Sequence, residues 1–307
     1  MHVVVTGASG HVGAALVRAL LARGDRVRAL VHRDVRALEG LDVELRRADV
    51  CDAAAVADAI AGADVVFHAA AKITIDDRPD PAADATNVAG TRHVIEACRA
   101  HRVRRLVHFS SVHARGDGNA YERSKALAER EVLAAVERGL DAVVVQPAAV
   151  IGPFDHKPSY IGRFLLMLAK GRVPLTVGGG QSWVDVRDVA ASSIAAAERG
   201  RRGAVYELAG HWRTMPDFAR EASRAAGARA PLGAIPLGVA RALAPLAAGA
   251  ARAAGREPLF TRGSIEALAG PPRELDRNAA RELGHAPRPL DETLRDTYAF
   301  FRERGML

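Results

Sequence analysis

Residues 3–13 read VVVTGASGHVG, and this segment decides the fold of the chain. A β-branched run leads directly into three glycines, Gly7, Gly10 and Gly13, and an amphipathic helical pattern follows. Glycines spaced three apart permit a tight turn, a close approach of the backbone to a pyrophosphate, and close packing of a helix on a strand. The helix N-terminus offers unpaired N–H groups and a partial positive charge to phosphates. The segment therefore predicts a dinucleotide-binding turn between a first strand and a first helix.

Short apolar runs alternate with amphipathic helical patterns over the first two-thirds of the chain. The predicted strands are Val3–Thr6, Val27–Val31, Val43–Leu45, Val65–His68, Leu106–Phe109 and Ala142–Gln146. The predicted helices between them are His11–Arg23, Ala53–Ala61, Ala82–Ala100 and Tyr121–Glu137. Several strands are continuous apolar runs, as expected where helices cover both faces of a parallel sheet. The pattern predicts a Rossmann-type, doubly wound α/β fold.

The rhythm changes after Pro147, where prolines and glycines separate shorter elements. We expect residues 1–150 to form the dinucleotide-binding domain, with about 183–209 returning to it. Residues 151–182 and 210–307 are expected to form a smaller lobe that binds substrate at the carboxyl ends of the strands. Within it, Thr214 followed by Pro216 predicts a helix start, and Leu290–Arg304 predicts the last helix.

The composition of the 307 residues is that of a soluble globular protein, with 49% hydrophobic and 26% charged residues. The chain enters its first apolar run without the charged segment of a secretory signal. Its most apolar stretch, Ile235–Ala254, is interrupted by Arg241 and Arg252, which argues against a membrane span. We therefore expect a cytoplasmic protein with no membrane partner.

The net charge of +7 is spread along the chain, and only 5% of the residues are aromatic. No basic patch with interleaved aromatic residues is present, so we expect no nucleic-acid partner. Two cysteines, Cys51 and Cys98, are too few for a framework of disulfides or a set of metal ligands. We expect no metal.

The residues after the second predicted strand bear on which dinucleotide binds. NAD sites usually place a carboxylate there, about 20 residues past the glycines, where it accepts a hydrogen bond from the ribose 2′-hydroxyl. Here Val31 is followed by His32 and Arg33, so that nothing acidic at this place repels a 2′-phosphate and Arg33 can pair with one. Asp34 weakens the argument. We expect NADP to be preferred, with NAD as the alternative.

Two further strand ends are expected to meet the cofactor. Asp49 and Val50 follow the third predicted strand, where an adenine would lie. Ala69, Ala70 and Ala71 follow the fourth, and their small side chains would let the backbone lie against the cofactor. Simple turn or packing chemistry also accounts for each of these segments.

The strongest chemical signal is Tyr121 with Lys125, preceded by Ser110 and Ser111 at the end of the fifth strand. A tyrosine and a lysine four residues apart lie one turn apart on the same helix face. A free phenol has a pKa near 10, and a neighbouring ammonium lowers it, so that the phenol becomes a better proton shuttle. A serine hydroxyl beside the phenol can orient a substrate carbonyl and stabilise charge on its oxygen.

Together these residues resemble the extended short-chain dehydrogenase/reductase family, also called the NAD-dependent epimerase/dehydratase superfamily. Within it, the pattern looks most like the dihydroflavonol-reductase-like branch. The resemblance covers nearly the whole chain and rests on residues 6–13, 66–71, 87–91, 106–111, 121–125, 146–147, 152–153 and 183–190.

The resemblance implies a role for each matching position. The catalytic trio would be Ser111, Tyr121 and Lys125, because the last hydroxyl before the aliphatic residue acts in this family. The residues that would hold the pyrophosphate are Gly7, Ser9, Gly10, His11, Val12 and Gly13. The residues that would line the rest of the cofactor are Val50, Ala69, Ala70, Asn87, Tyr121 and Lys125, with Pro147 and Val150 near the nicotinamide. A homodimer through the helices around residues 91–100 and 121–137 is also implied.

Two departures from the family pattern matter. Only nine residues separate Ser111 from Tyr121, which predicts a more open substrate mouth than in relatives with a longer loop. Nucleotide-sugar dehydratases place an Asp-Glu pair after their hydroxyl residue, whereas Val112, His113 and Ala114 stand here. Elimination chemistry therefore lacks its acid and base.

We therefore expect an NADP(H)-preferring oxidoreductase that reduces a ketone or aldehyde by hydride transfer, with Tyr121 as acid and base. The stretch Pro231–Ala254 is rich in Ala and Leu and suggests an apolar lid, hence a small apolar or aromatic carbonyl substrate. Two alternatives stay open. One is a nucleotide-sugar epimerase or dehydratase with tightly bound NAD, and the other is a non-catalytic dinucleotide-binding regulator.

Overall fold

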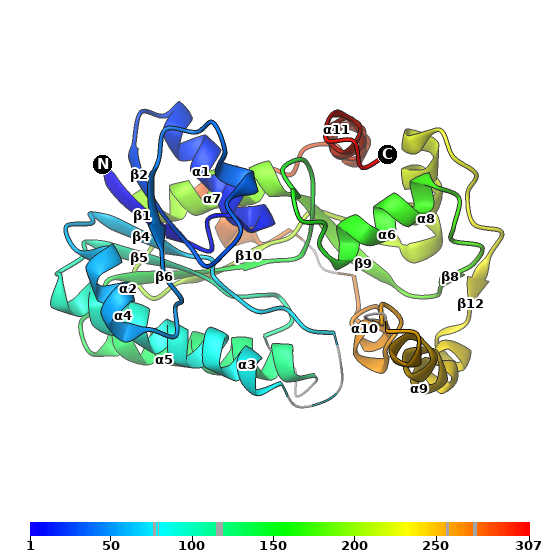
Figure 1. Cartoon of the computed structure of the whole chain (residues 1–307), viewed down its shortest axis with the longest axis horizontal. Coiled ribbons are helices and arrows are strands. Elements are labelled where there is room, and N and C mark those ends of the chain that lie inside the picture. The colour runs from blue at the N-terminus through cyan, green and yellow to red at the C-terminus, as the bar shows by residue number, and fades with distance from the viewer. Residues whose placement is uncertain (76–77, 79, 115–118, 256–257, 273–274) are drawn as a thin grey trace.

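The structure is a computed structural model that describes residues 1–75, 78, 80–114, 119–255, 258–272 and 275–307. Its larger part is built on a parallel sheet of seven strands in the order β10-β6-β5-β4-β1-β2-β3 (Figure 1). These strands are β1 (His2–Thr6), β2 (Arg26–Val31), β3 (Glu44–Arg47), β4 (Val65–His68), β5 (Arg105–Phe109), β6 (Ala142–Pro147) and β10 (Val205–Leu208). The order runs outward from β1 in both directions, which confirms the predicted doubly wound α/β fold.

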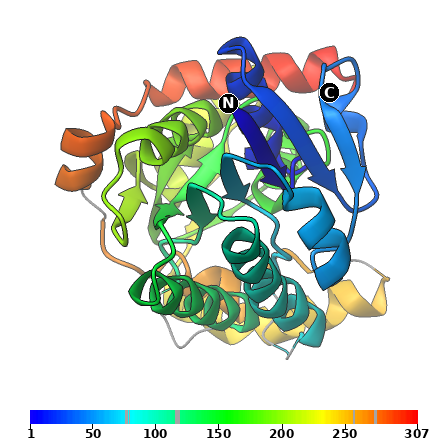
Figure 2. The same ribbon diagram turned by 90° about the vertical axis from the view of Figure 1, so that its left-hand side faces the viewer.

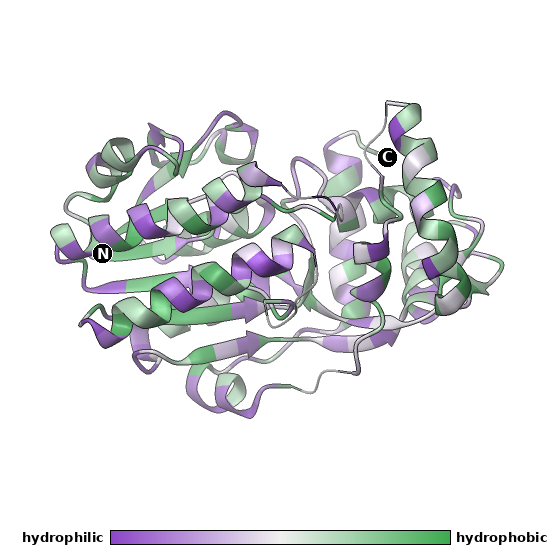
Figure 3. Cartoon of the chain, turned by 90° about the horizontal axis from the view of Figure 1, so that it is seen from below, coloured by the Kyte–Doolittle hydropathy of each residue, from purple (hydrophilic) through white to green (hydrophobic). Residues whose placement is uncertain are grey.

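Helices cover both faces of this sheet. The helices on one face are α1 (His11–Ala22) and α7 (Val186–Arg199), and those on the other are α2 (Ala53–Ile60), α4 (Gly90–Ala100) and α5 (Ala120–Glu137). Figure 2 shows the second layer, coloured blue to green, below the strands. Seen from that side, hydrophilic and hydrophobic residues alternate along the helices, as in amphipathic helices that bury one face (Figure 3). Val3 and Val5 enter one core and Val4 the other, so the centre of β1 is a continuous apolar run.

One predicted helix, Ala82–Ala100, is interrupted in the structure. It consists of α3 (Pro81–Asp84), a π-helical turn η2 (Ala85–Ala89) and α4. The π turn carries Asn87, whose side chain bonds to the backbone of Lys72 and to Ser124. Such turns are rare and often lie at functional sites. A single-turn 3-10 helix, η1 (Arg36–Leu38), follows β2.

The smaller lobe lies beside the carboxyl ends of the large sheet (Figure 1). Its strands form one sheet in the order β11-β9-β7 and one pair, β12-β8. These strands are β7 (Ala149–Ile151), β8 (Thr176–Val177), β9 (Gly180–Asp185), β11 (His211–Thr214) and β12 (Ala234–Ile235). The helical elements are α6 (Tyr160–Ala169), α8 (Met215–Ala226), α9 (Leu237–Ala253), α10 (Arg262–Glu266) and α11 (Leu290–Glu303). The π-helical turn η3 (Ala279–Leu283) packs instead against α7 and β10 of the larger part.

The lobe has its own hydrophobic core, and the two helix predictions made for it are confirmed. Trp183 stacks on Phe218 with ring centroids 3.6 Å apart. Thr214 caps α8 by accepting a hydrogen bond from the Asp217 N–H at 3.2 Å, as the sequence predicts, and α11 matches the predicted last helix to within one residue. Of the segment expected to return to the large sheet, α7 and β10 pack there, whereas β9 pairs with β7 and β11. The proposed domain boundaries stay a prediction.

The apolar stretch near residue 240 forms α9. This helix buries Ala240 and Ala244 in a small core with Ile265 of α10 and leaves Leu243 and Leu246 exposed. Across the described ranges, no helix has the length and apolar character that crossing a membrane requires.

Candidate active site

The turn between β1 and α1 is shaped to receive a pyrophosphate. Gly7 has φ of +66°, and a Cβ there would lie 2.6 Å from the Ala70 nitrogen. A Cβ on Gly13 would lie 2.2 Å from the Gly7 oxygen, so only glycine lets α1 approach the turn this closely. Within the described residues, α1 begins at Gly10 without a side-chain cap, which leaves its first N–H groups for a ligand. The residues present therefore fit a dinucleotide.

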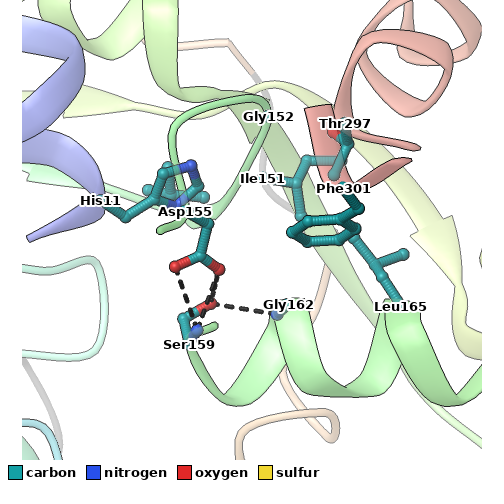
Figure 4. A pocket seen from close by; sticks show the side chains of 10 residues that line it. His11, Ile151, Gly152, Asp155, Ser159, Gly162, Leu165, Thr297 and Phe301 are labelled. Carbon is teal, nitrogen blue, oxygen red and sulfur yellow. Dashed lines mark hydrogen bonds between the residues drawn. The ribbon is translucent and has the colours of Figure 1, made fainter. Parts of the chain in front are cut away.

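The side chain of His11 has a different partner from the expected phosphate. Its Nε2 lies 3.0 Å from the carbonyl oxygen of Pro153, so the imidazole joins the glycine turn to the loop after β7. Figure 4 shows His11 beside this loop, where Asp155 accepts hydrogen bonds from Ser159. The pocket drawn there has no room for a water molecule. It is a packed junction, and only the backbone N–H of His11 stays in place for the predicted pyrophosphate contact.

The residues expected at the adenosine end lie together at the sheet edge. His32 and Arg33 are exposed after β2, and the His32 Nε2 lies 3.6 Å from an Asp49 carboxylate oxygen. Asp34 is bound at 2.6 Å by Arg36, whose guanidinium lowers the pKa of Asp34 to about 2. Asp34, the acidic residue that weakened the argument for NADP, is therefore paired with the Arg36 cation. Val50, by contrast, is buried under Gly90, where a Cβ would lie 2.8 Å from a Val50 methyl group.

A chain of hydrogen bonds holds the turn after β4 against the glycine turn. The Ala70 N–H donates to the Thr6 hydroxyl at 3.2 Å, and the same hydroxyl lies 2.8 Å from Nδ1 of His68. His68 reaches the Thr91 hydroxyl of α4 with its other nitrogen, at 2.9 Å. Burial lowers the pKa of His68 to about 3, so this ring is neutral at physiological pH. The role of His68 escaped the sequence analysis because its two partners, Thr6 of β1 and Thr91 of α4, come from separate elements.

Asn87 also connects segments that are distant in sequence. Its carbonyl oxygen accepts from the Lys72 N–H at 2.8 Å, and its amide donates to the Lys72 carbonyl at 3.0 Å and to the Ser124 hydroxyl at 2.8 Å. Ser124 in turn donates to the Tyr121 carbonyl oxygen at 2.8 Å. Asn87 thus holds the turn after β4 against the first turn of α5. Its predicted contact with the cofactor stays a prediction.

The three expected catalytic residues meet where β5 ends and α5 begins. Asn119 starts α5 through a capping box, in which its side chain accepts from the Glu122 N–H at 3.0 Å. Tyr121 follows in the first turn, and its phenol lies close enough to the Ser111 hydroxyl for that group to act on the Tyr121 pKa. One turn later Lys125 donates to the backbone carbonyl of Phe109. Ser111 and Lys125 are buried, with 7% and 3% of their surface exposed.

Burial dominates the electrostatics of this trio. It raises the pKa of Tyr121 to about 12, against the effect of the hydrogen bond from Ser111, and the Glu122 charge adds to the rise. It also lowers the pKa of Lys125 to about 8, while the Glu129 carboxylate opposes that change. The expected net lowering of the Tyr121 pKa is therefore wrong for this arrangement, because desolvation of the phenol outweighs the effects of its neighbours. Tyr121 stays protonated at neutral pH, which is the form that can give a proton to a carbonyl oxygen.

A cavity of about 360 Å³ opens next to the trio, between the large sheet and the lobe. It is lined by Val112, His113, Glu122, Ala148, Ala149, Gly180, Gln181, Ser182, Trp212, Glu266, Ala267, Gly270 and Pro271. His113 and Glu122 face each other there, 3.9 Å apart, and burial raises the pKa of Glu122. Most of these residues escaped the sequence analysis because they come from strands and loops far apart in the chain. The short loop expected to widen the mouth includes residues 115–118, which lie outside the described residues.

Two expected nicotinamide neighbours lie near this cavity. Pro147 ends β6, and its carbonyl accepts from the Val112 N–H at 3.3 Å. Val150 lies in β7 opposite Val184, on the side of the His11 junction. Their predicted contact with the nicotinamide stays a prediction.

Comparison with known proteins agrees with this geometry. The profile of the NAD dependent epimerase/dehydratase family matches residues 3–209, and the chain belongs to this family. It is 38% identical to sterol demethylase protein B of Methylococcus capsulatus, over 100% of both chains. It is 31% identical to the "Putative dihydroflavonol 4-reductase" of Synechocystis sp., over 98% of this chain and 94% of the other. The crystal structure of gox2253 has 34% identity and a TM-score of 0.86, over 99% of both chains.

These matches confirm the resemblance drawn from the motifs. The chain is an NAD(P)-dependent oxidoreductase of the short-chain dehydrogenase/reductase type, with relatives that are named as reductases. Its substrate is a small molecule.

Proposed function

We propose that the protein is an NADP(H)-preferring reductase of a ketone or aldehyde that also oxidises the corresponding secondary alcohol. The observation that carries this proposal is the convergence of Ser111 and Tyr121 next to the cavity of about 360 Å³, whose wall includes their chain neighbours Val112 and Glu122. A phenol and a hydroxyl placed together next to a cavity can both act on a single carbonyl oxygen. The rise of the Tyr121 pKa keeps the acid form available for reduction at neutral pH.

The residues of this chain would act as follows. The helix α1 N-terminus and the glycine turn bind the pyrophosphate, and the bound dinucleotide supplies the hydride. Ser111 donates a hydrogen bond that orients the substrate oxygen, and Tyr121 gives that oxygen its phenolic proton. The Lys125 ammonium, four residues along the same helix face, stabilises the phenolate that this transfer leaves and reaches toward the cofactor ribose. In alcohol oxidation, Tyr121 takes the proton back.

The substrate proposed is a largely hydrocarbon ketone or aldehyde. The cavity wall combines the indole of Trp212 and the methyl groups of Val112, Ala148 and Ala149 with five polar side chains. One relative is named as a sterol demethylase protein and another as a dihydroflavonol reductase, and both names denote ring compounds. An epimerase of nucleotide sugars with tightly bound NAD is the competing function, and it predicts that NAD(H) remains bound during purification.

The cofactor preference can be tested through Arg33. We expect Arg33→Ala to weaken NADPH binding about tenfold and to leave NADH binding unchanged, because a charge-assisted contact with the 2′-phosphate contributes about 1.5–3 kcal/mol. Isothermal titration of the purified, cofactor-free protein measures both affinities. The matched control is Arg26→Ala, an exposed arginine at the opposite end of β2. Equal weakening of NADPH and NADH binding by Arg33→Ala, or tightly retained NAD(H) in the wild type, would overturn the NADP assignment.

The pH dependence of reduction follows from Lys125. Its pKa is lowered to about 8, so the ammonium is charged below that pH and loses its charge as the pH rises through it. We expect kcat/KM for carbonyl reduction to be highest below pH 8 and to fall above it. A pH–rate profile measures this limb, and Lys125→Arg should abolish it because a guanidinium keeps its charge. An alkaline limb that survives in Lys125→Arg would assign it to another group.

A further inference from the structure

A partly buried acidic group follows the expected catalytic lysine on α5. Glu129 stands one helical turn after Lys125 on α5, on the same face of the helix. One oxygen of its carboxylate accepts from the Ser110 hydroxyl at 2.5 Å and from the Gln146 amide at 2.8 Å. Ser110 and Gln146 are 6% and 1% exposed, and they come from the ends of β5 and β6. The carboxylate is therefore fixed by two strands as well as by its own helix.

The other groups that face Lys125 carry no compensating negative charge at neutral pH. On α5 the other group is Tyr121, which is a neutral phenol because burial raises its pKa to about 12. On the sheet they are His68 of β4 and His108 of β5, whose pKa values are both lowered by burial. His108 has no hydrogen-bond partner for either ring nitrogen among the described residues, so a positive charge on its ring would be unsatisfied. Within the described residues, Glu129 is the acidic group that opposes the loss of charge by Lys125.

We propose that Glu129 is a positioning residue of the reaction, a fixed counter-charge that Ser110 and Gln146 hold in place so that the buried Lys125 keeps its proton beneath Tyr121. The inference rests on the proposed function, because Lys125 acts on the phenol only in its charged form. It also gives Ser110 a role distinct from that of Ser111. Ser111 directly precedes Val112, a residue of the cavity wall, and Ser110 donates a hydrogen bond to the Glu129 carboxylate. In this proposal Ser111 acts beside Tyr121, and Ser110 acts on Glu129.

The charge of Lys125 can be measured without any substrate. The chain has four lysines, Lys72, Lys125, Lys157 and Lys170, so the side-chain NMR signals of isotope-labelled lysine are few, and Lys125→Arg assigns the signal of interest. In Glu129→Gln, which keeps the shape and an oxygen acceptor for Ser110, we expect the Lys125 titration midpoint to fall by about one unit. The matched control is Glu131→Gln on the same helix, whose carboxylate pairs with Arg92 at the surface. It should leave the midpoint unchanged.

A second variant keeps the test decisive if Glu129→Gln does not fold. Ser110→Ala removes one of the two hydrogen bonds that hold the carboxylate, and it should move the Lys125 midpoint in the same direction by a smaller amount. An unchanged midpoint in either folded variant overturns the proposal. So does a shift of equal size in the Glu131→Gln control.

Kinetics separate a positioning role from a merely structural one. In Glu129→Gln the alkaline limb of kcat/KM should move to lower pH by the same amount as the Lys125 midpoint, with little loss at the acid end. A loss that is equal at every pH would contradict the inference. If the Lys125 midpoint shifts as expected but the wild type reduces no carbonyl compound, the electrostatic pairing stands and the proposed function fails. If the wild type reduces a carbonyl compound and the Lys125 midpoint does not move in Glu129→Gln, the proposed function stands and the electrostatic pairing fails.

Discussion

Replacing Tyr121 with phenylalanine is expected to lower kcat for carbonyl reduction by about 100- to 10,000-fold, the range typical for loss of a general acid. The substitution removes one oxygen atom and the proton that the substrate oxygen receives. The phenyl ring keeps its place in the first turn of α5, since the Asn119 capping box and the Asn87–Ser124 bonds hold this turn through other atoms. Dinucleotide affinity and the thermal midpoint should therefore stay close to those of the wild type. Steady-state kinetics and a titration with NADPH measure the two effects separately.

Tyr160→Phe provides the matched control for this experiment. Tyr160 starts α6 in the lobe, where its ring packs under the Arg163 guanidinium with the cation 4.7 Å from the ring centroid. The same change of residue there should leave kcat unaltered. If Tyr121→Phe keeps full activity, the assignment of the proton donor is wrong. A wild type that binds dinucleotide and turns over no carbonyl substrate would instead favour the regulator that the sequence left open.

Substituting Gly13 with alanine is expected to abolish tight dinucleotide binding and to lower the free energy of unfolding by about 1–3 kcal/mol. The new Cβ would lie 2.2 Å from the Gly7 oxygen and 2.8 Å from the Ala8 Cα, and both are backbone atoms that cannot rotate away. Helix α1 would have to move off the turn, and its N–H groups would move with it. Urea unfolding and calorimetric titration with NADPH measure the two consequences.

The control for Gly13 is Gly238→Ala, also within a helix. A Cβ at Gly238 would meet no atom within 4 Å, and alanine is the better helix former, so this variant should be as stable as the wild type or more so. Wild-type NADPH affinity in Gly13→Ala would show that the close approach of helix and turn is not required for binding.

The sheet could be predicted from the sequence because each signal that defines it is local. The strand Val65–His68 is buried at every position and opens with three apolar residues, and its bounds in the structure are those predicted. The helix interrupted at η2 could not be predicted in the same way. Its π turn is stabilised by Asn87 bonding to Lys72 and to Ser124, which are 15 and 37 residues away. The spacing of apolar residues carries no information about partners at such distances, so the sequence pattern predicts one continuous helix.

The same division applies to the site. The glycine spacing and the four-residue interval from Tyr121 to Lys125 follow from the geometry of one turn and one helix, so both were evident in the sequence. The effect of burial on the Tyr121 phenol was not, because the protein that surrounds the ring comes from separate strands and helices. The His11 side chain bonds to the carbonyl oxygen of Pro153, which is 142 residues away. No sequence motif indicates a backbone partner at that distance.

The sequence by itself indicated the fold class, the dinucleotide turn and, through the family resemblance, three expected catalytic side chains, because the motifs that carry them are local. Only the tertiary structure decided how those side chains are tuned and what they face. Burial sets the protonation of Tyr121 and Lys125, and two strand ends fix Glu129 behind the lysine. The substrate cavity is assembled from both parts of the molecule. Desolvation and convergence of distant segments arise only when the chain is folded, and they convert a recognisable motif into a proton-donating site.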